Sequence, residues 1–164
     1  MDNYIVINGK KAELTEEQLK ALGIEVKKNR VFNRAKIYAT YYRINHVGEV
    51  IAETENHTAY DDNLYNVANY CIDKAIMEQR ALHETLNRWL WRFSMEHDGE
   101  KIDWNNHSQQ KYFIYFDSHL ECSIGWDMHH CRIGAVYFYT REIAEQAINE
   151  VIKPFMAEHP EFRW

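Results

Sequence analysis

Residues 111–154 read KYFIYFDSHLECSIGWDMHHCRIGAVYFYTREIAEQAINEVIKP and indicate three strands followed by a helix. The strand runs are rich in aromatic and β-branched residues: YFIYF at 112–116, CSIGW at 122–126 and IGAVYF at 133–138. Thr140 then favours a helix start, because its hydroxyl can accept from the unpaired amides of a first turn. The apolar residues after it fall on one helical face: Ile143, Ala144, Ala147, Ile148, Val151, Ile152 and Phe155. Pro154 lacks an amide hydrogen and discourages further helix.

The same order of elements is indicated earlier in the chain. Residues 37–44 and 49–53 read as two strands joined by a turn, and residues 65–71 read as a third strand before a helix capped by Asp73. The segment that links the third expected strand to the helix, residues 69–75, corresponds in pattern to residues 137–143 of the later unit. The sequence therefore predicts an α+β fold of antiparallel sheets, each packed by a helix. Two copies of one strand-strand-strand-helix unit are a hypothesis, and the alternative is that hairpin-plus-helix units simply recur in α+β proteins.

The longest expected helix runs from Asp73 to about His97. Trp89 and Trp91 cannot both face the same way on it, because residues two apart lie about 200° apart around a helix. One of the two is expected either in a second interior layer or at a lobe junction or partner surface.

The opening of the chain is expected to form a small accessory unit. Residues 4–8 read as a strand, the sequence TEEQ at 15–18 reads as a helix start, and Gly23 reads as the end of that helix. We therefore expect three parts. They are an N-terminal strand-helix segment at 1–30, a first β-hairpin and helix unit at 31–98, and a second sheet and helix unit at 99–164.

Composition excludes several classes of protein. The net charge of the 164 residues is −6, which disfavours attraction of the whole molecule to nucleic acid or anionic membranes. No segment approaches the roughly 18 apolar residues that span a bilayer, and the start lacks the features of a secretory signal. Three cysteines without a close motif favour a reducing cytosol over a disulfide scaffold. The six glycines are scattered, so no phosphate-binding loop, and no cofactor, is expected.

The most unusual electrostatic feature lies between Arg43 and Lys74, where there is no Lys or Arg. The predicted partner-binding residues in this stretch are acidic: Glu49, Glu53, Glu55, Asp61 and Asp62. The three glutamates share strand parity, so we expect them to project from one sheet face. Such a surface could occupy a basic groove as nucleic acid would. The alternative is a solvated face whose counter-charges come from residues distant in sequence.

A histidine-rich loop is the best candidate for a metal site. The candidate ligands are His119, His129 and His130, with Cys122 and Cys131 close in sequence. Zinc needs three or four converging ligands, usually from paired short-spaced motifs. Adjacent histidines point different ways in most backbones, and no CxxC or HxxxH pair supports them. A hairpin loop that carries two histidines is therefore the default interpretation, and no metal is expected.

Motifs that carry a family resemblance lie along most of the chain, at residues 7–11, 14–19, 31–34, 41–44, 48–50, 62–70, 99–106 and 111–116. In these motifs the sequence resembles small phage and prophage proteins of Firmicutes and gut metagenomes. Proteins of this size and source include inhibitors of CRISPR effector nucleases, and the type II anti-CRISPR proteins are the most similar. The resemblance implies a mobile-element origin and brings no active-site pattern with it.

The resemblance and the acidic stretch together imply a phage-encoded anti-defence protein of the bacterial cytoplasm. We expect it to inhibit a type II CRISPR effector nuclease, alone or in complex with guide RNA, by stoichiometric binding that competes with nucleic acid. Sequence-specific DNA binding and membrane association are not expected. Two alternatives stay open: a small phage nuclease or hydrolase that uses the histidine-rich loop, and a phage accessory or assembly protein that binds its own kind.

Overall fold

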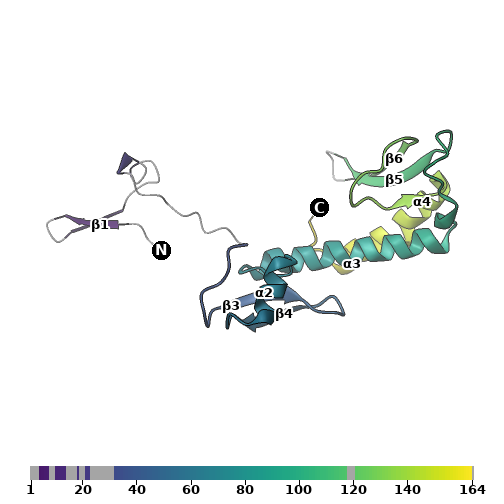
Figure 1. Ribbon diagram of the computed structural model, residues 1–164. Helices are drawn as coiled ribbons and strands as arrows, with labels where there is room; N and C mark the ends of the chain where they lie inside the picture. Colours follow the sequence, from purple (N-terminus) through teal and green to yellow (C-terminus); the bar gives the residue numbers. More distant parts are fainter. Residues whose placement is uncertain are drawn as a thin grey trace. The chain divides into compact units, whose positions relative to one another are not determined.

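The computed structural model describes residues 4–7, 10–13, 18, 21–22, 32–117 and 121–163. The chain divides into two compact units, Met1–Asn33 and Arg34–Trp164 (Figure 1). In the first unit, β1 (Tyr4–Ile7) pairs antiparallel with β2 (Lys10–Glu13). The strand expected at 4–8 is thus present as β1, whereas most of the helix expected at 15–23 lies outside the described residues.

The first half of the second unit is a hairpin beside a long helix. Strand β3 (Thr40–Ile44) pairs antiparallel with β4 (Val50–Thr54), and Cys71 pairs with Tyr42 on the other edge of β3. Helix α3 (Lys74–Glu96) then begins at Asp73, whose carboxylate accepts a hydrogen bond of 3.2 Å from the Ile76 amide. The predicted long helix and its cap are confirmed.

The second half of this unit contains a three-stranded sheet followed by helices. After a 3₁₀ turn, η1 (Gly99–Lys101), strand β5 (Lys111–Phe116) lies between β6 (Cys122–Asp127) and β7 (Tyr137–Phe138), and both pairings are antiparallel. Helix α4 (Arg141–Ala147) begins at Thr140, whose hydroxyl accepts from the Ile143 amide at 3.3 Å. The fold is α+β with antiparallel sheets, as the sequence predicts.

The two halves have matching joins between sheet and helix. In each half the helix cap comes two residues after a residue that pairs with the first strand: Asp73 follows Cys71, and Thr140 follows Phe138. In the structure Cys71 therefore corresponds to Phe138. The sequence pattern of residues 69–75 and 137–143 instead places Cys71 opposite Tyr139, one residue further along. The repeat itself stays a prediction.

Two expected strands differ in the structure. Where residues 65–71 were expected to be a strand, helix α2 (Ala59–Asn66) occupies the start of the segment, and only Cys71 pairs with the sheet. The helix forms because Thr58 and Asp61 cap it reciprocally, each side chain accepting from the other residue's amide. The third strand of the other half is reduced from 133–138 to the two residues of β7.

Pro154 does not end the last helix. After α4 the chain continues as one wide π turn, η2 (Ile148–Ile152), and then as α5 (Lys153–Glu158) with Pro154 in its first turn. In the wide turn the Lys153 amide donates to the carbonyl of Ile148, five residues back. Pro154 stands directly after this wide turn, where the regular bond to the fourth residue back, which a proline breaks, has not yet resumed.

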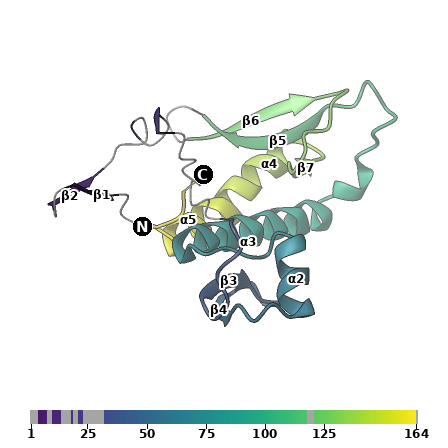
Figure 2. The same ribbon diagram turned by 60° about the vertical axis from the view of Figure 1, so that its left-hand side comes forward.

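Helix α3 lies at the centre of the second unit. Figure 2 shows the β3–β4 hairpin and α2 on one side of α3, and the other sheet with α4 and α5 on the opposite side. The buried apolar core on that opposite side consists of Leu86, Leu90, Phe93, Phe138, Ala144, Ala147, Ile152, Phe155 and Phe162. Trp89 packs edge-on against Phe155 at 5.5 Å between ring centroids, whereas Trp91 is 60% exposed. Among the described helices, none combines the length and the apolar character needed to cross a membrane.

Candidate functional site

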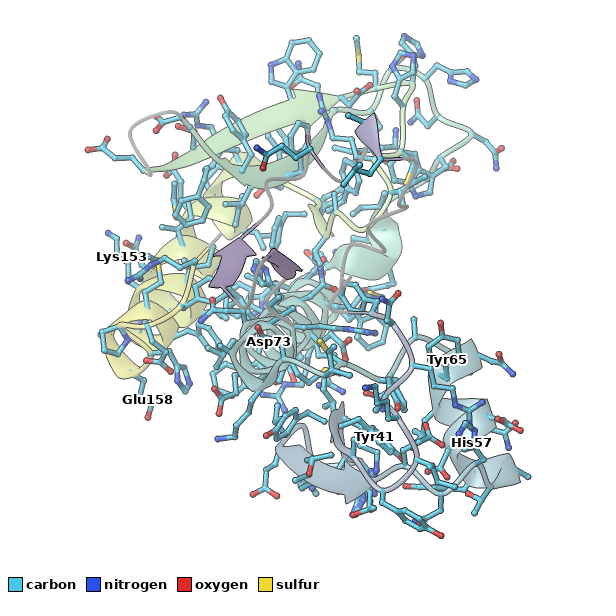
Figure 3. All side chains as sticks on the ribbon, turned by 90° about the vertical axis from the view of Figure 1, so that its left-hand side faces the viewer. Tyr41, His57, Tyr65, Asp73, Lys153 and Glu158 are labelled. Atoms are coloured by element: carbon cyan, nitrogen blue, oxygen red, sulfur yellow. The ribbon has the colours of Figure 1, made fainter. Side chains whose placement is uncertain are left out.

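The five predicted partner-binding carboxylates gather around the β3–β4 hairpin and α2, but they do not form one exposed surface. Glu53 lies opposite Tyr41 in the sheet, whereas Glu49 and Glu55 lie just outside β4, so the common face expected for the three glutamates stays a prediction. The sheet face that carries Tyr41 and Glu53 is covered by α2, because Tyr41 bonds to Asp61 and Arg43 lies over the Tyr60 ring. Figure 3 shows Tyr41 on the hairpin and Tyr65 on α2 beside it. The exposed fraction is consequently 0% for Glu55 and 3% for Asp61. The expectation that all five face a partner is wrong for these two.

Glu55 accepts four hydrogen bonds inside the protein. Arg34 donates to both carboxylate oxygens, from Nε to Oε2 at 3.0 Å and from Nη2 to Oε1 at 2.9 Å. The Tyr70 hydroxyl donates at 2.7 Å, and the His57 amide donates at 2.8 Å. The Arg34 guanidinium, followed by these other donors, holds the pKa of Glu55 below its ordinary value despite burial. Glu55 therefore ties residues before the hairpin to residues after it.

Asp61 fixes the loop between β4 and α2. Its Oδ2 accepts from the amides of Asn56 at 3.1 Å and Thr58 at 3.0 Å, and from the Thr58 hydroxyl at 2.8 Å. Its Oδ1 accepts from the Tyr41 hydroxyl at 2.8 Å. The Thr58 amide contributes most to a pKa of Asp61 that lies well below its ordinary range. The Tyr41 ring in turn stacks on Tyr70, with 4.0 Å between centroids, so the two buried carboxylates support one aromatic pair.

The remaining carboxylates are largely compensated by arginines. Arg34 reaches Asp62 at 2.6 Å in addition to Glu55, and Arg43 pairs with Glu53 at 2.8 Å. Among the described residues, the Glu49 carboxylate accepts only from the Asn45 side chain, at 3.1 Å. The hypothesis of wholly uncompensated carboxylates is therefore wrong, because both arginines fold in from outside the basic-free stretch. Residues 34–66 carry three basic residues, Arg34, Lys36 and Arg43, against these five carboxylates, so the segment nevertheless keeps a net negative charge.

The buried carboxylates predict acid lability. The unfolded chain binds protons at these groups near pH 4, whereas the pKa values of Glu55 and Asp61 are lower in the folded state. Their contribution to stability is thus fully present above about pH 5 and is lost as the pH falls toward the folded-state values. We expect the urea midpoint, followed by circular dichroism, to fall between pH 5 and pH 3.

A matched pair of variants tests that assignment. Asp61→Asn removes the buried carboxylate and should make the fall in the urea midpoint shallower. Asp62→Asn removes the exposed neighbour and should leave the slope of the wild-type protein nearly unchanged. An Asp61→Asn protein with the full wild-type pH dependence would contradict the role of Asp61.

The histidine-rich loop is a turn built on Asp127. One oxygen of Asp127 accepts from the amides of His129 at 3.0 Å and His130 at 2.9 Å, and these bonds lower the pKa of Asp127 to about 2. The His130 side chain is 82% exposed. His129 Nδ1 lies 3.4 Å from His107 Nδ1, a neighbour that sequence spacing does not indicate. His119 lies outside the described residues, and within the described ranges no three His, Cys, Asp or Glu residues are placed to hold a metal.

A groove of about 530 Å³ borders α3 and was not predicted from the sequence. Its apolar lining comes from four separate segments of the chain and includes Leu86, Leu90, Ile114, Val136, Phe138 and Ile152. The charged and polar side chains that line it all come from α3: His83, Glu84, Asn87 and Arg88. The Asn87 side chain donates to the carbonyl of Gly134 at 3.0 Å, which fastens the 134–136 segment to α3.

The chemistry of these regions differs. The Glu55 and Asp61 cluster is fully hydrogen-bonded and buried, which suits it to rigidify the hairpin and α2. The groove offers a concave apolar surface of a size typical for small ligands. Comparison with known proteins adds no family: no protein-family model, no curated protein and no solved structure matches this chain.

Proposed function

We propose that this chain is a phage-encoded anti-defence protein that inhibits a type II CRISPR effector nuclease by stoichiometric binding. The observation that supports this proposal is a rigid acidic surface on the hairpin and α2. Three carboxylates, those of Glu49, Glu53 and Asp62, remain at least partly exposed there, while Glu55 and Asp61 hold the scaffold from inside. The surface would cover a Lys/Arg-rich site on the nuclease that otherwise meets DNA or guide RNA.

Rigidity and charge contribute to such binding in different ways. A surface fixed before binding loses less conformational entropy on association. Its negative charge speeds the encounter with a basic site and fixes the orientation. Tyr60 and Tyr65 are 50% and 39% exposed beside the acidic residues, and aromatic residues are enriched at protein interfaces. The acidic surface therefore combines electrostatic steering with apolar contact area.

The test removes the three exposed charges together. The variant Glu49→Gln, Glu53→Gln, Asp62→Asn should bind the effector with an association rate lowered by about tenfold at low salt, because electrostatic steering is weakened. The rate should also depend less on salt than that of the wild-type protein. Biolayer interferometry with the effector, with and without guide RNA and at several salt concentrations, measures both quantities.

The control variant carries the same change of charge elsewhere. Glu145→Gln, Glu150→Gln, Glu158→Gln removes three exposed carboxylates from the segment that spans α4, η2 and α5, and it should bind like the wild-type protein. Unchanged binding by the first variant, or an equal loss with the control, would end the proposed mechanism. Inhibition at far less than one protein per effector would favour the enzyme alternative.

A further inference from the structure

We propose that His107 and His129 together chelate a Zn²⁺ ion. The two histidines stand on different connections, His107 between η1 and β5 and His129 just after β6. The sequence groups His129 with His119 and His130, whereas the structure brings it to His107. Neither member of the pair belongs to the acidic surface, so this inference does not depend on the proposed function. It is carried by the spacing of the two rings and by the buried Lys111 that fixes both connections.

The spacing of the two imidazole rings matches that of two ligands on a tetrahedral ion. Two Zn–N bonds of about 2.0–2.1 Å at the tetrahedral angle place the nitrogen atoms about 3.3–3.4 Å apart and the ring centroids about 5.2 Å apart. In the protein, His107 Nδ1 lies 3.4 Å from His129 Nδ1, and the ring centroids are 5.4 Å apart. A contact of 3.4 Å is longer than the roughly 2.7–3.2 Å usual for N–H···O hydrogen bonds in proteins. The pair is therefore better spaced to share a metal ion than to share a proton.

A buried lysine holds the backbone of both histidines in place. Lys111 is 0% exposed, and its ammonium group donates to the carbonyls of Asn106 at 3.0 Å and Met128 at 3.4 Å. These two carbonyls belong to the residues directly before His107 and His129. One side chain therefore bridges the two peptide groups from which the proposed ligands extend. Because the two backbones are fixed before an ion binds, chelation loses less conformational entropy.

The ligand set determines which ions the pair accepts. Neutral imidazole nitrogen suits Zn²⁺ and neighbouring transition metals, whereas Mg²⁺ and Ca²⁺ require oxygen ligands. Among the described residues, no third His, Cys, Asp or Glu is placed to join the pair. Both side chains are exposed, so water can fill the remaining coordination positions. Since closed structural zinc sites have four protein ligands, we expect this two-ligand chelate to bind zinc more weakly than such a site does.

The test titrates the full chain with zinc chloride at neutral pH and follows binding by isothermal titration calorimetry. We expect saturable binding of one Zn²⁺ per chain and no binding of Mg²⁺ under the same conditions. His107→Ala and His129→Ala should each weaken zinc binding by at least about tenfold, because in the wild-type protein the second imidazole binds the ion intramolecularly. Two control variants should keep the wild-type affinity: His130→Ala, next to the pair in sequence, and His46→Ala, in the turn between β3 and β4.

Imidazole NMR signals locate the site without any variant. In long-range ¹H–¹⁵N spectra of the wild-type protein, zinc should shift the Nδ1 signals of His107 and His129 and leave that of His130 in place. Wild-type affinity in His107→Ala, or an equal loss in His130→Ala, would overturn the proposal, the latter in favour of the two neighbouring histidines of the turn. One zinc bound per two chains would also overturn the single-chain chelate, in favour of an ion shared between two copies.

Discussion

Glu55→Gln is expected to lower the free energy of unfolding by about 3 kcal/mol. The wild-type carboxylate is fully buried, and each of its oxygens accepts a hydrogen bond from Arg34. The substitution removes the buried charge and turns one acceptor into a donor that faces the Arg34 guanidinium or the Tyr70 hydroxyl. Breaking one side of a buried ion pair costs about 3–5 kcal/mol, and the loss lies at the low end of that range because Arg34 is 28% exposed and keeps Asp62 as a partner. Urea denaturation at pH 7 measures the difference.

Glu53→Gln is the matched control for this experiment. Glu53 lies in β4, two residues before Glu55, and is also paired with an arginine, Arg43, but its side chain is 32% exposed. Water can replace that pair, so its loss should cost less than about 1 kcal/mol. Equal destabilisation by the two variants would show that burial of Glu55 has no special part in the stability of the hairpin and α2.

Phe155→Ala is expected to lower the free energy of unfolding by about 4 kcal/mol. Phe155 is 0% exposed and contacts three rings, those of Trp89, His159 and Phe162. Its removal leaves a cavity between α3 and α5 that the surrounding side chains can fill only in part. Truncation of a buried phenylalanine costs about 3–5 kcal/mol for this reason. Thermal and urea unfolding, followed at 222 nm, give the value.

Trp91→Ala provides the comparison, since it removes a larger ring that is 60% exposed. We expect its effect on the free energy of unfolding to stay within about 0.5 kcal/mol, as for most surface substitutions. If Trp91→Ala proved as destabilising as Phe155→Ala, Trp91 would have to be packed in solution. Trp89, which is 38% exposed and packs against Phe155, would then not be the better packed of the two tryptophans.

Local signals in the sequence predict the helices well. Asp73 and Thr140 cap α3 and α4 as expected, because a cap involves only residues within one turn of each other. Helix α2 has an equally local signal in Thr58 and Asp61, but its aspartate stands where a capping box more often has Glu or Gln. The α+β class followed from the aromatic strand runs and the helical spacing, which are properties of short windows.

The candidate sites depend on contacts between distant segments, which periodicity does not reveal. Strand parity predicts a common face for the glutamates, but only tertiary packing shows that α2 covers the face that carries Glu53 and Tyr41. The partner of Glu55 is 21 residues earlier in the chain, outside the stretch that lacks basic residues. The groove likewise brings Leu86, Ile114 and Ile152 together from elements that no local pattern connects.

The π turn at Ile148–Ile152 also determines how this helical segment would tolerate the deletion of a residue. Ala147 and Ile152 are both fully buried although they are five residues apart. In a regular α-helix a spacing of five turns a side chain by about 140°, so one of them would face water. The turn thus acts as a one-residue insertion that resets the phase of the helix, and it allows Ala144 and Phe155 to serve the same core. A deletion that restored regular winding would put Pro154 under the regular pattern of bonds to the fourth residue back, where its ring meets a carbonyl one turn earlier. We therefore expect such a deletion to be tolerated only if the proline is replaced as well.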